Sequence, residues 1–473
     1  MVLNSTLPEV KLSEFVCNLS YDQLPPRTIR ATKSDILDVF AAAVAGSSAS
    51  GTREVVDLMA EFGGNGSSTI FVFGLQTPPP SAALANGTMA HALDYDDTHD
   101  LAVLHAGVTV VPAAFAVAEY IGKVNGKDFI AAVASGIEVT CRMGLATKPW
   151  IGWILTPLYG YFGASTAAAK LLQLDPEGLL NAWGIAYAQA AGNTEGSASG
   201  ALTKRLQAGL AASGGVLAAL LAKRGITGAR ESMGGQAGIF NLYQRGEYDS
   251  AALTQGLGNG FEVERLSYKP YPCCRFTHTA IDAALDITRR YNIEADQIAE
   301  VTVNVSKEAY DLCEPEDVKS NPRTIVDAQF SIPYTVAVAL VKKKVCIDDF
   351  TDQAIKEKTV LTISNRVKCI VSMRPTEGMA RGIAPCKITV KMTGGSSFSS
   401  RIDVAKGHPE NPMTEEELFN KFQDCMAHAV RPLPGATSRK LLQVVGELED
   451  VHEIKEIADL LRGGAMPWAS QQS

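Results

Sequence analysis

Histidines and aspartates are concentrated in one segment of this chain. Residues 91–105 read His-Ala-Leu-Asp-Tyr-Asp-Asp-Thr-His-Asp-Leu-Ala-Val-Leu-His and hold three of the seven histidines together with four aspartates. Imidazoles beside carboxylates are suited to proton transfer near neutral pH and to metal binding. The segment is therefore predicted to carry chemistry.

A metal site is one interpretation of this segment. His91, Asp97, His99 and Asp100 offer imidazole and carboxylate ligands for a divalent ion, and would make the chain a metal-dependent hydrolase. The His99-Asp100 dipeptide is a short signal, however, and few histidines follow it downstream. The sequence therefore favours proton transfer without a metal, and the hydrolase remains the alternative.

A lysine and an arginine stand at the predicted start of another helix. Lys204 and Arg205 open an Ala/Gly-rich stretch that ends near Gly225. Two cations at a helix N-terminus oppose the positive end of the helix dipole. A bound carboxylate would offset this cost by interacting with both side chains and with the free N–H groups of the first turn. The pair predicts a carboxylate-binding site, with a solvated charged edge as the alternative.

A third candidate for a functional segment lies where the helical pattern of the chain gives way to an extended linker. Lys269-Pro-Tyr-Pro-Cys-Cys-Arg-Phe-Thr-His278 leads from an extended linker into a helix, with Thr277 as the expected cap and His278 in the first turn. The positive end of a helix lowers the pKa of an imidazole and keeps it neutral, as a general base requires. Clefts often form at domain junctions, so His278 is a second candidate base, with a core histidine as the alternative.

The elements that must position these residues are mainly helical. Apolar residues at 36, 37, 40 and 44 follow helical spacing, with Ser34 as the expected cap and Gly46 as the expected end. Similar patterns predict helices over about 81–95, 107–122, 126–145, 160–173, 178–191 and 204–224. A helix over 81–95 would place His91 and Asp94 on one face, with residues 96–105 in the loop beyond.

A different organisation follows residue 260. A helix is expected over about 277–292, the alternation of Val301–Val305 predicts a strand, and 387–392 with 401–404 predict a hairpin around Gly394-Gly395. Helix returns after a capping box at Thr414. This order predicts a mostly α fold: a large all-helical domain of residues 1–267 and 406–473, with an inserted smaller α+β lid domain of residues 268–405.

Composition limits the classes of protein. The net charge of -8 argues against a general nucleic-acid binder and leaves room for a small anionic substrate. Nine cysteines without a CxxC pair predict a reduced, intracellular chain. The N-terminus has no secretory signal pattern, and the uncharged stretch 149–169 contains prolines and glycines, which favours a buried segment over a membrane span. We expect a cytoplasmic protein with no membrane or nucleic-acid partner.

Several enzyme classes have no motif here. The chain contains no G-x-S-x-G, Walker loop, G-x-G-x-x-G or H-E-x-x-H sequence. Nucleophile-elbow hydrolases, P-loop enzymes, dinucleotide binders and zincins therefore lack positive support.

The ordered motifs of the chain resemble those of the MmgE/PrpD family. They are Ala90-His-Ala-Leu-Asp-Tyr-Asp-Asp97, Leu104-His-Ala-Gly107 with Val111-Pro-Ala-Ala114, Gly160-Tyr-Phe-Gly-Ala164, Lys204-Arg-Leu with Gly209, Lys269-Pro-Tyr-Pro-Cys with His278, and Asp327-Ala-Gln-Phe-Ser-Ile-Pro-Tyr334. The resemblance covers nearly the whole chain. It implies a helical domain with an α+β lid, a homodimer, no metal or organic cofactor, and activity at carbons next to carboxylates of di- or tricarboxylic acids.

The resemblance also implies the site residues. The family's active-site positions correspond to Asp94, Thr98, His105, Lys204, His278 and Tyr334 of this sequence. Two family histidines are absent, because Ile154 and Gln207 stand at their positions. Both changes remove a polar group that could hold a carboxylate or leaving group, so the family's decarboxylase activity is the one they put most in doubt.

These observations predict cofactor-independent proton transfer next to a carboxylate. Asp94 is expected to orient His105, and His105 or His278 to act as base. Lys204, with Arg205, would bind the carboxylate and stabilise the charge that develops on it. Thr98 and Tyr334 would bind substrate, and Tyr334 could also protonate a leaving group. The expected reaction is a hydro-lyase reaction of the 2-methylcitrate dehydratase type, with cis-aconitate-type decarboxylation or iminodisuccinate-type epimerisation as alternatives.

Overall fold

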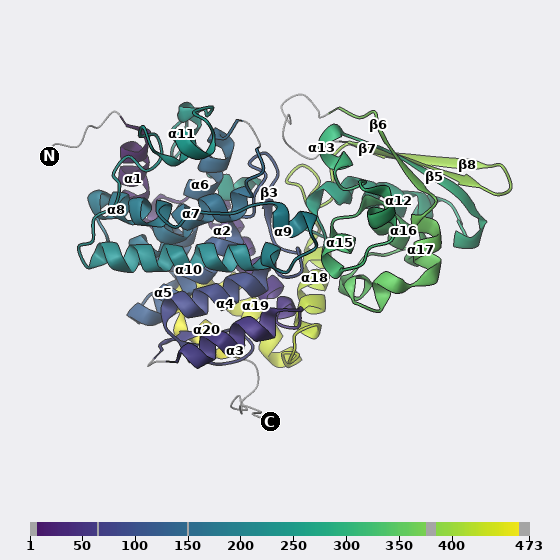
Figure 1. The fold of residues 1–473 in the computed structure, drawn as a ribbon. Coiled ribbons are helices and arrows are strands. Elements are labelled where there is room, and N and C mark those ends of the chain that lie inside the picture. The colour runs from purple at the N-terminus through teal and green to yellow at the C-terminus, as the bar shows by residue number, and fades with distance from the viewer. Residues whose placement is uncertain (1–6, 64–65, 149–150, 375–384, 463–473) are drawn as a thin grey trace.

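The molecule has a helical part and a smaller part that contains a sheet, lying side by side in the computed structural model (Figure 1). The structure describes residues 7–63, 66–148, 151–374 and 385–462. Buried apolar residues form two clusters, one drawn from residues 10–266, Ile347 and residues 422–461, and the other from residues 273–392. The predicted mostly α fold is confirmed. The division into a helical domain and an inserted lid remains a prediction, with which these two clusters agree.

The helical part is built from both ends of the chain. Its helices are α1 Pro8–Asn18, α2 Pro26–Gly46, α3 Thr52–Phe62, α4 Pro79–His91, α5 Gly107–Ile121, α6 Gly126–Ala146, α7 Leu155–Leu171, α8 Pro176–Tyr187, α9 Glu195–Ala198, α10 Thr203–Lys223, α11 Ile239–Tyr243, α18 Glu415–Ala427, α19 Gly435–Gly446 and α20 Lys455–Leu461. The helices predicted from periodicity are all present, most of them with shifted ends. Two boundaries matter: α2 begins at Pro26, so Ser34 lies inside it, and α4 ends at His91 rather than at Tyr95.

Two pairs of short strands accompany these helices. β1 Ser68–Thr69 pairs with β2 Gln76–Thr77, and β3 Thr98–His99 pairs with β4 Leu266–Ser267, both antiparallel. The second pair ties the segment rich in aspartate and histidine to the chain that enters the sheet-containing part.

Small residues let α4 and α10 lie close together. A Cβ atom added to Gly209 would lie 2.3 Å from the carbonyl oxygen of Leu84 and 2.2 Å from the hydroxyl of Thr88. Since side-chain atoms do not approach a backbone oxygen so closely, only glycine fits here. The contact matters for function because Lys204 lies on the first turn of α10 and is positioned by this packing.

We expect Gly209→Ala to destabilise the protein by about 1–3 kcal/mol, because the added methyl group must push α10 away from α4. Urea unfolding measures this. Gly446→Ala is the matched control, since a Cβ atom at Gly446 meets no atom within 4 Å. Equal stability of the two variants would contradict the prediction.

The other part contains a four-stranded sheet of order β6-β5-β7-β8. Its strands are β5 Ile298–Val305, β6 Val367–Val371, β7 Cys386–Met392 and β8 Ser397–Ile402, and its helices are α12 His278–Arg290, α13 Lys307–Tyr310, α14 Glu316–Ser320, α15 Ile325–Gln329, α16 Ile332–Lys342 and α17 Lys358–Ser364. The predicted strand and hairpin are present, with Val303 opposite Ile388 and Val390 opposite Phe398, but the second hairpin strand, expected over 401–404, spans Ser397–Ile402. β6 pairs in parallel with β5 and was not predicted.

Helix α18 joins the two parts (Figure 1). It begins with the predicted capping box, in which the Thr414 hydroxyl accepts from the Glu417 N–H and the Glu417 carboxylate accepts from the Thr414 N–H. Lys421 on this helix donates to Asp38 of α2 at 2.5 Å and to the carbonyl of Tyr95 at 2.8 Å. The C-terminal helices thereby pack on the segment rich in aspartate and histidine.

Within the part of the chain that the structure describes, two helices are long and apolar enough to cross a membrane, α6 and α10. The most apolar stretch of α6 is 94% buried within the protein, as expected for a core helix, and that of α10 is 56% buried. The uncharged stretch around residues 149–169 forms most of α7, whose residues Leu155–Ala169 are buried as predicted; residues 149 and 150 lie outside the described residues.

Candidate active site

A sharp turn after α4 sets the direction of Asp94. The helix ends at His91, and Asp94 has a φ of 53°, in the left-handed region that residues other than glycine seldom occupy. The prediction that His91 and Asp94 share one helical face is therefore wrong. The turn instead directs the carboxylate of Asp94 toward α10 and the segment after β4.

Asp94 lies between two lysines. Its Oδ1 atom accepts from Lys204, while Nζ of Lys269 lies 3.3 Å from Oδ2 and donates to the backbone carbonyl of Asp94 at 2.9 Å. All three side chains are buried. Burial alone would raise the pKa of Asp94, but the two ammonium groups outweigh it and hold that pKa well below its usual value. The group Asp94, Lys204 and Lys269 therefore carries one more positive than negative charge.

The expected anionic partner of the α10 cations is thus a side chain of the protein itself. Lys204 is paired with Asp94, and Arg205 donates to the carbonyl of Ser50 at 3.0 Å. Arg205 is buried, which lowers its pKa, and its hydrogen bond to the backbone of Ser50 has a structural role. The structure therefore brings Lys204 into the site, and Arg205 stands behind it.

Asp96 lies between two imidazoles. Its Oδ2 atom is 2.8 Å from Nδ1 of His91 and 2.9 Å from Nδ1 of His105, and the two rings stand 4.8 Å apart between centroids. The carboxylate that orients His105 is therefore Asp96, and the expectation that Asp94 does so is corrected. Burial lowers the pKa of His91 to about 4, so His91 is neutral at pH 7.

His105 is held as one tautomer. Its Nδ1 atom lies 2.7 Å from the carbonyl oxygen of Asp97, and because a carbonyl only accepts, Nδ1 carries the proton. The basic lone pair of the neutral ring is then on Nε2. The backbone N–H of His105 donates to the hydroxyl of Thr156 at 3.0 Å, which fixes the residue against the start of α7.

Exposure separates His105 from the other imidazoles of this region. Its side chain is 16% exposed, whereas those of His91 and His99 are 2% and 1% exposed and His278 is fully buried. A small molecule can therefore reach His105 more readily than the others.

His278 has both ring nitrogens engaged. Nε2 lies 3.2 Å from the carbonyl of Cys273 and must donate to it, and Nδ1 accepts from Arg275 at 3.3 Å. The pKa of His278 is well below its usual value, as expected, but the first cause is burial and the next are the charges of Arg275 and Lys269. Thr277, the expected cap, does not cap α12 with its side chain, since its hydroxyl donates to the carbonyl of Cys274.

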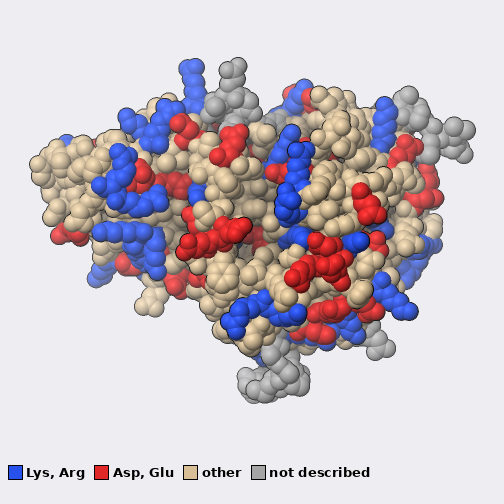
Figure 2. Space-filling view, turned by 180° about the vertical axis from the view of Figure 1, so that it is seen from behind, with Lys and Arg blue, Asp and Glu red and all other residues tan. Residues whose placement is uncertain are grey.

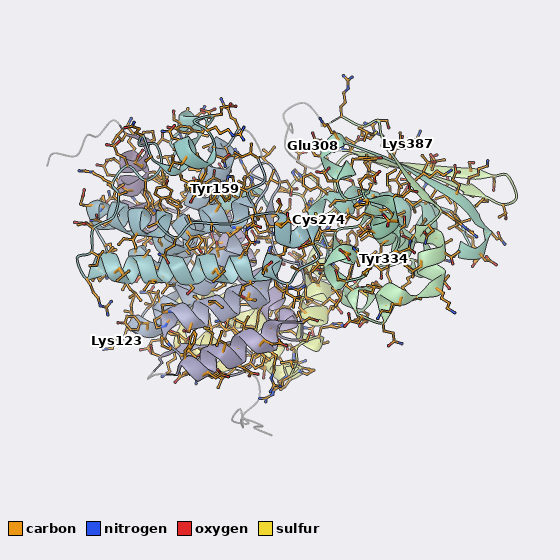
Figure 3. The ribbon with its side chains drawn as sticks, in the orientation of Figure 1. Lys123, Tyr159, Cys274, Glu308, Tyr334 and Lys387 are labelled. Carbon is orange, nitrogen blue, oxygen red and sulfur yellow. The ribbon has the colours of Figure 1, made fainter. Side chains whose placement is uncertain are left out.

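The two remaining predicted residues, Thr98 and Tyr334, lie in different parts of the molecule. Thr98 is buried on β3, and its hydroxyl is buried without a hydrogen-bond partner among the described residues. Tyr334 lies within the sheet-containing part, and its hydroxyl donates to the carbonyl of Asp349 at 2.6 Å (Figure 3). Burial raises the pKa of Tyr334. This structure does not bring the hydroxyl of Tyr334 into contact with Lys204 or His105.

The four residues of the metal alternative have separate partners. His99 accepts the N–H of Ala102 on Nδ1 and donates from Nε2 to Glu262 at 3.0 Å, while Asp100 binds Ser267 and Arg275. Asp97 accepts two backbone N–H groups. His91 binds Asp96. The predicted set does not converge on a common point, because β3 and the turn after it direct these side chains apart.

One other trio has donor atoms close together, namely His91, Asp96 and His105, within 4.8 Å of one another. The two distances to Asp96 are those of charge-assisted hydrogen bonds. We therefore assign this trio to hydrogen bonding.

Sequence reasoning did not select two residues that hold the site together. Lys269 lies within one of the family-like motifs but was not predicted to be a site residue. Its position in an extended segment next to proline was the available signal that its ammonium group has a fixed place. Gln329 donates to the carbonyls of Leu93 and Pro272, at 2.8 and 3.3 Å, and so links α15 to the turn at Asp94. Cys274, beside these groups, lies where the two parts of the molecule meet (Figure 3).

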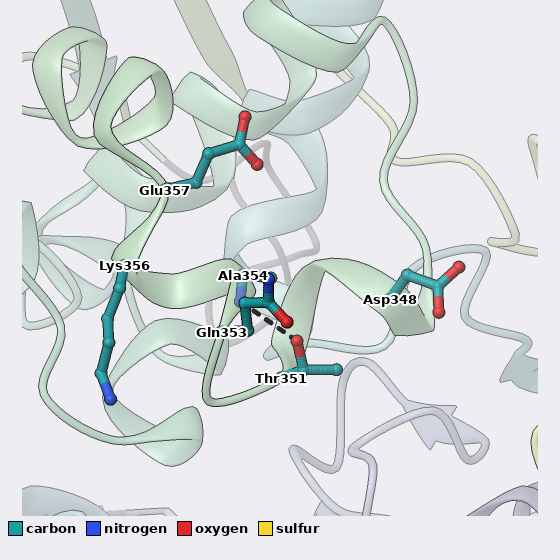
Figure 4. Close-up of a pocket in the computed structure, with 6 residues that line it drawn as sticks. All are labelled: Asp348, Thr351, Gln353, Ala354, Lys356 and Glu357. Atoms are coloured by element: carbon teal, nitrogen blue, oxygen red, sulfur yellow. Dashed lines mark hydrogen bonds between the residues drawn. The ribbon is translucent and has the colours of Figure 1, made fainter.

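A hollow on the sheet-containing part is lined by residues of mixed charge and contains none of the predicted residues (Figure 4): Asp348, Thr351, Gln353, Ala354, Lys356 and Glu357. On the face seen in Figure 2, basic and acidic side chains are interspersed. This face does not have the continuous basic band that nucleic-acid binding requires.

Comparison with known proteins agrees with the motifs. Residues 10–251 match the MmgE/PrpD N-terminal domain, and residues 271–445 match the MmgE/PrpD C-terminal domain. The chain is 26% identical to the cis-aconitate decarboxylase of Aspergillus terreus, over 96% of this chain and 92% of the relative. It is 27% identical to that of Homo sapiens, over 96% and 94%.

A second kind of relative matches over a shorter length. The 2-methylcitrate dehydratase of Salmonella typhimurium is 25% identical over 59% of each chain. Decarboxylases and dehydratases of this kind are both lyases. With both domains of the family matched in order along its length, the chain belongs to the MmgE/PrpD family.

Proposed function

We propose that this protein is a cofactor-independent lyase that removes a proton next to a carboxylate of a small di- or tricarboxylic acid. The observation that carries the proposal is His105. It is the partly exposed imidazole of the site, its Nδ1–H is fixed by Asp96 and the Asp97 carbonyl, and its basic Nε2 is left for substrate.

The charge balance of the site supports an anionic substrate. Lys204 and Lys269 share one carboxylate, that of Asp94, so one positive charge is left in a buried region. A substrate carboxylate would complete the balance and would be attracted to the same place. Lys204, with 9% of its side chain exposed, is the better placed of the two lysines to bind it, since Lys269 is fully buried.

The proposed reaction begins with transfer of the proton to Nε2 of His105. Asp96 stabilises the imidazolium that forms, and Lys204 stabilises the negative charge that the carboxylate of the substrate takes up. The electron pair of the broken C–H bond then forms the double bond, and the β-hydroxyl group leaves as water after taking a proton from a nearby ammonium group.

Two considerations favour different members of the lyase class. A neutral imidazole held as a base suits dehydration, which requires proton removal, better than decarboxylation, which does not. The whole-length likeness to cis-aconitate decarboxylases favours decarboxylation. Ile154 precedes Thr156 at the start of α7, beside His105, and provides no charge for a further carboxylate. We therefore place dehydration first and decarboxylation second, with epimerisation as a further alternative.

A substrate panel in deuterated water tests the proposal. The enzyme is incubated, with a chelator present, with hydroxy-, unsaturated and imino-dicarboxylic and tricarboxylic acids, and the products are followed by NMR. New alkene signals from a hydroxy acid indicate dehydration, loss of carbon dioxide indicates decarboxylation, and deuterium exchange without net conversion indicates epimerisation. Activity that the chelator abolishes would contradict the cofactor-independent scheme.

We also propose that the protein is a homodimer that pairs through α10. Leu210 and Leu217 on this helix, together with Leu202 just before it, are 42%, 41% and 44% exposed at helical spacing and form an exposed apolar row. We expect the double variant Leu210→Asp, Leu217→Asp to be monomeric by light scattering. Leu242→Asp, 59% exposed on α11, is the control and should remain a dimer. An unchanged mass of the double variant would contradict the interface.

A further inference from the structure

A second group of buried carboxyls lies behind the site. Asp35 and Asp38 project from α2, and Asp97 follows Asp96 in the loop before α5. All four side chains are buried, with exposures from 0% to 7%. A buried carboxylate normally has a cation or several N–H donors as partners, so each of them requires an explanation.

Hydrogen-bond and ion-pair partners explain the burial of some of these carboxyl groups. Asp38 is paired with Lys421, and Asp96 with the two imidazoles. The Oδ2 atom of Asp97 accepts from the N–H groups of Ala106 and Gly107, at 3.1 and 3.2 Å. Five carboxyl oxygens of this group remain without a hydrogen-bond partner among the described residues: both oxygens of Asp35, Oδ2 of Asp38, Oδ1 of Asp96 and Oδ1 of Asp97.

Two of these unpartnered oxygens, Oδ2 of Asp35 and Oδ1 of Asp97, lie beside Gly107. A Cβ atom built on Gly107 would lie 2.7 Å from Oδ2 of Asp35 and 2.7 Å from Oδ1 of Asp97. Both oxygens therefore line the same small space beside the Cα atom of Gly107, which only a residue without a side chain leaves open. Helix α2 and the loop before α5 meet at this point.

Two ionised carboxylates cannot remain together in this position. Lys421, the nearest lysine, is bound to Asp38 and Tyr95, and water does not reach these atoms. One proton between the two carboxyls would satisfy an oxygen of each residue and remove the repulsion, as in other buried carboxyl pairs. We propose that Asp35 holds this proton and donates it to Oδ1 of Asp97, and that Asp35 is thereby a positioning residue for His105.

The electrostatics of the pair agree with this geometry. Burial, followed by the charge of Asp97, raises the pKa of Asp35 well above its usual value, and burial with Asp96 raises the pKa of Asp97 to about 7. The other ionisable groups that face the pair belong to several elements: Asp38 on α2, Asp96 and His105 on the loop, Cys141 on α6, Tyr268 after β4 and Lys421 on α18.

The link to His105 passes through the backbone of Asp97. The carbonyl of Asp97 accepts the Nδ1–H of His105 at 2.7 Å, so the position of this residue sets the tautomer and direction of the imidazole. The proposed hydrogen bond from Asp35 holds Oδ1 of Asp97, and the N–H groups of Ala106 and Gly107 hold Oδ2. Both carboxyl oxygens of Asp97 are then fixed in position. This positioning role depends on the proposed function of His105 as base, whereas the shared proton does not.

The pair also predicts how stability depends on pH. Because the pKa values of the folded protein lie above those of the unfolded chain, the stabilisation is complete at acidic pH, below the ordinary aspartate pKa of about 4. It is lost progressively as the pH rises toward and through about 7, the pKa of Asp97. Replacement of Asp35 by asparagine, which is neutral at every pH and still donates an N–H, should remove most of this loss.

Two variants of Asp35 test the inference in the full-length protein. Asp35→Asn keeps a donor for Asp97, and Asp35→Leu removes it. Near neutral pH, wild type should have the infrared band of a protonated carboxylic acid, and both variants should lack it. In urea unfolding, Asp35→Asn should gain stability relative to wild type as the pH rises. The proposal of a shared proton would be overturned if the infrared band persists in Asp35→Asn. It would also be overturned if the stabilities of wild type and Asp35→Asn depend on pH in the same way.

Kinetics test the positioning role separately. Asp35→Asn should keep kcat within about twofold of wild type, with a changed pH profile. Asp35→Leu should lower kcat by about 10- to 100-fold with little change in KM, as expected for a misplaced base. If the infrared band is lost while Asp35→Leu keeps full kcat and the wild-type pH profile, the positioning role is refuted. If His105 proves dispensable, the proposed function fails, but the infrared and unfolding results still decide the shared proton.

Discussion

Replacement of His105 by glutamine is expected to lower kcat by about a thousandfold. Glutamine can keep a hydrogen bond to the carbonyl of Asp97, so the loop should retain its shape, but its amide cannot accept a proton from carbon. The loss should fall mainly on kcat, because the proposed scheme assigns binding of the substrate carboxylate to Lys204 rather than to the imidazole.

Steady-state kinetics on the substrate identified by the panel measure this effect. Exchange of the substrate's C–H hydrogen in deuterated water should fall in parallel with kcat, because both require the same base. His452→Gln is the matched control, since His452 is exposed and lies in a segment that pairs with residues 124–126 at the start of α6. If His105→Gln keeps substantial activity while His278→Gln loses it, the assignment of the base to His105 is wrong and His278 takes that role.

Much of the helical part follows directly from the sequence pattern. The predicted spans 107–122 and 126–145 correspond to α5 Gly107–Ile121 and α6 Gly126–Ala146, because glycines interrupt long apolar stretches at their ends. The hairpin β7–β8 follows from alternation and a Gly-Gly turn. β6 gave no such signal: it is an edge strand whose Ile370 and Val371 are each 48% exposed, and it reaches β5 by a crossover that no turn motif marks.

The identity of the site residues was easier to predict than their pairing. His105, Lys204 and Asp94 were selected by residue type and motif, and the structure places all three at one location. The partner of His105 was assigned incorrectly because the left-handed turn at Asp94 cannot be read from periodicity. Asp35 was not predicted as a site residue, since on an amphipathic helix an aspartate beside the apolar positions is usually solvated, and the packing of α2 against the start of α5 at Gly107 cannot be inferred from periodicity.

Replacement of Asp94 by asparagine is expected to cost about 3–5 kcal/mol of stability, because it leaves two buried ammonium groups without their counter-charge. The effect should depend on pH. Since the pKa of Asp94 is lowered in the folded protein, its stabilisation is present above the ordinary aspartate pKa of about 4 and is lost as the pH falls toward the folded value. The difference between wild type and Asp94→Asn in urea unfolding should therefore be largest near neutral pH and should shrink in acid.

A double variant distinguishes loss of charge balance from loss of shape. In Asp94→Asn with Lys269→Met, one of the two lysines is removed with the carboxylate, so part of the stability should return relative to Asp94→Asn alone, giving a coupling energy of the sign expected for an ion pair. Asp57→Asn, which removes an exposed partner of Arg53, is the control and should cost less than about 1 kcal/mol. Additive effects of the two substitutions, or a loss of stability that does not change with pH, would mean that Asp94 acts through its shape in the turn rather than through its charge.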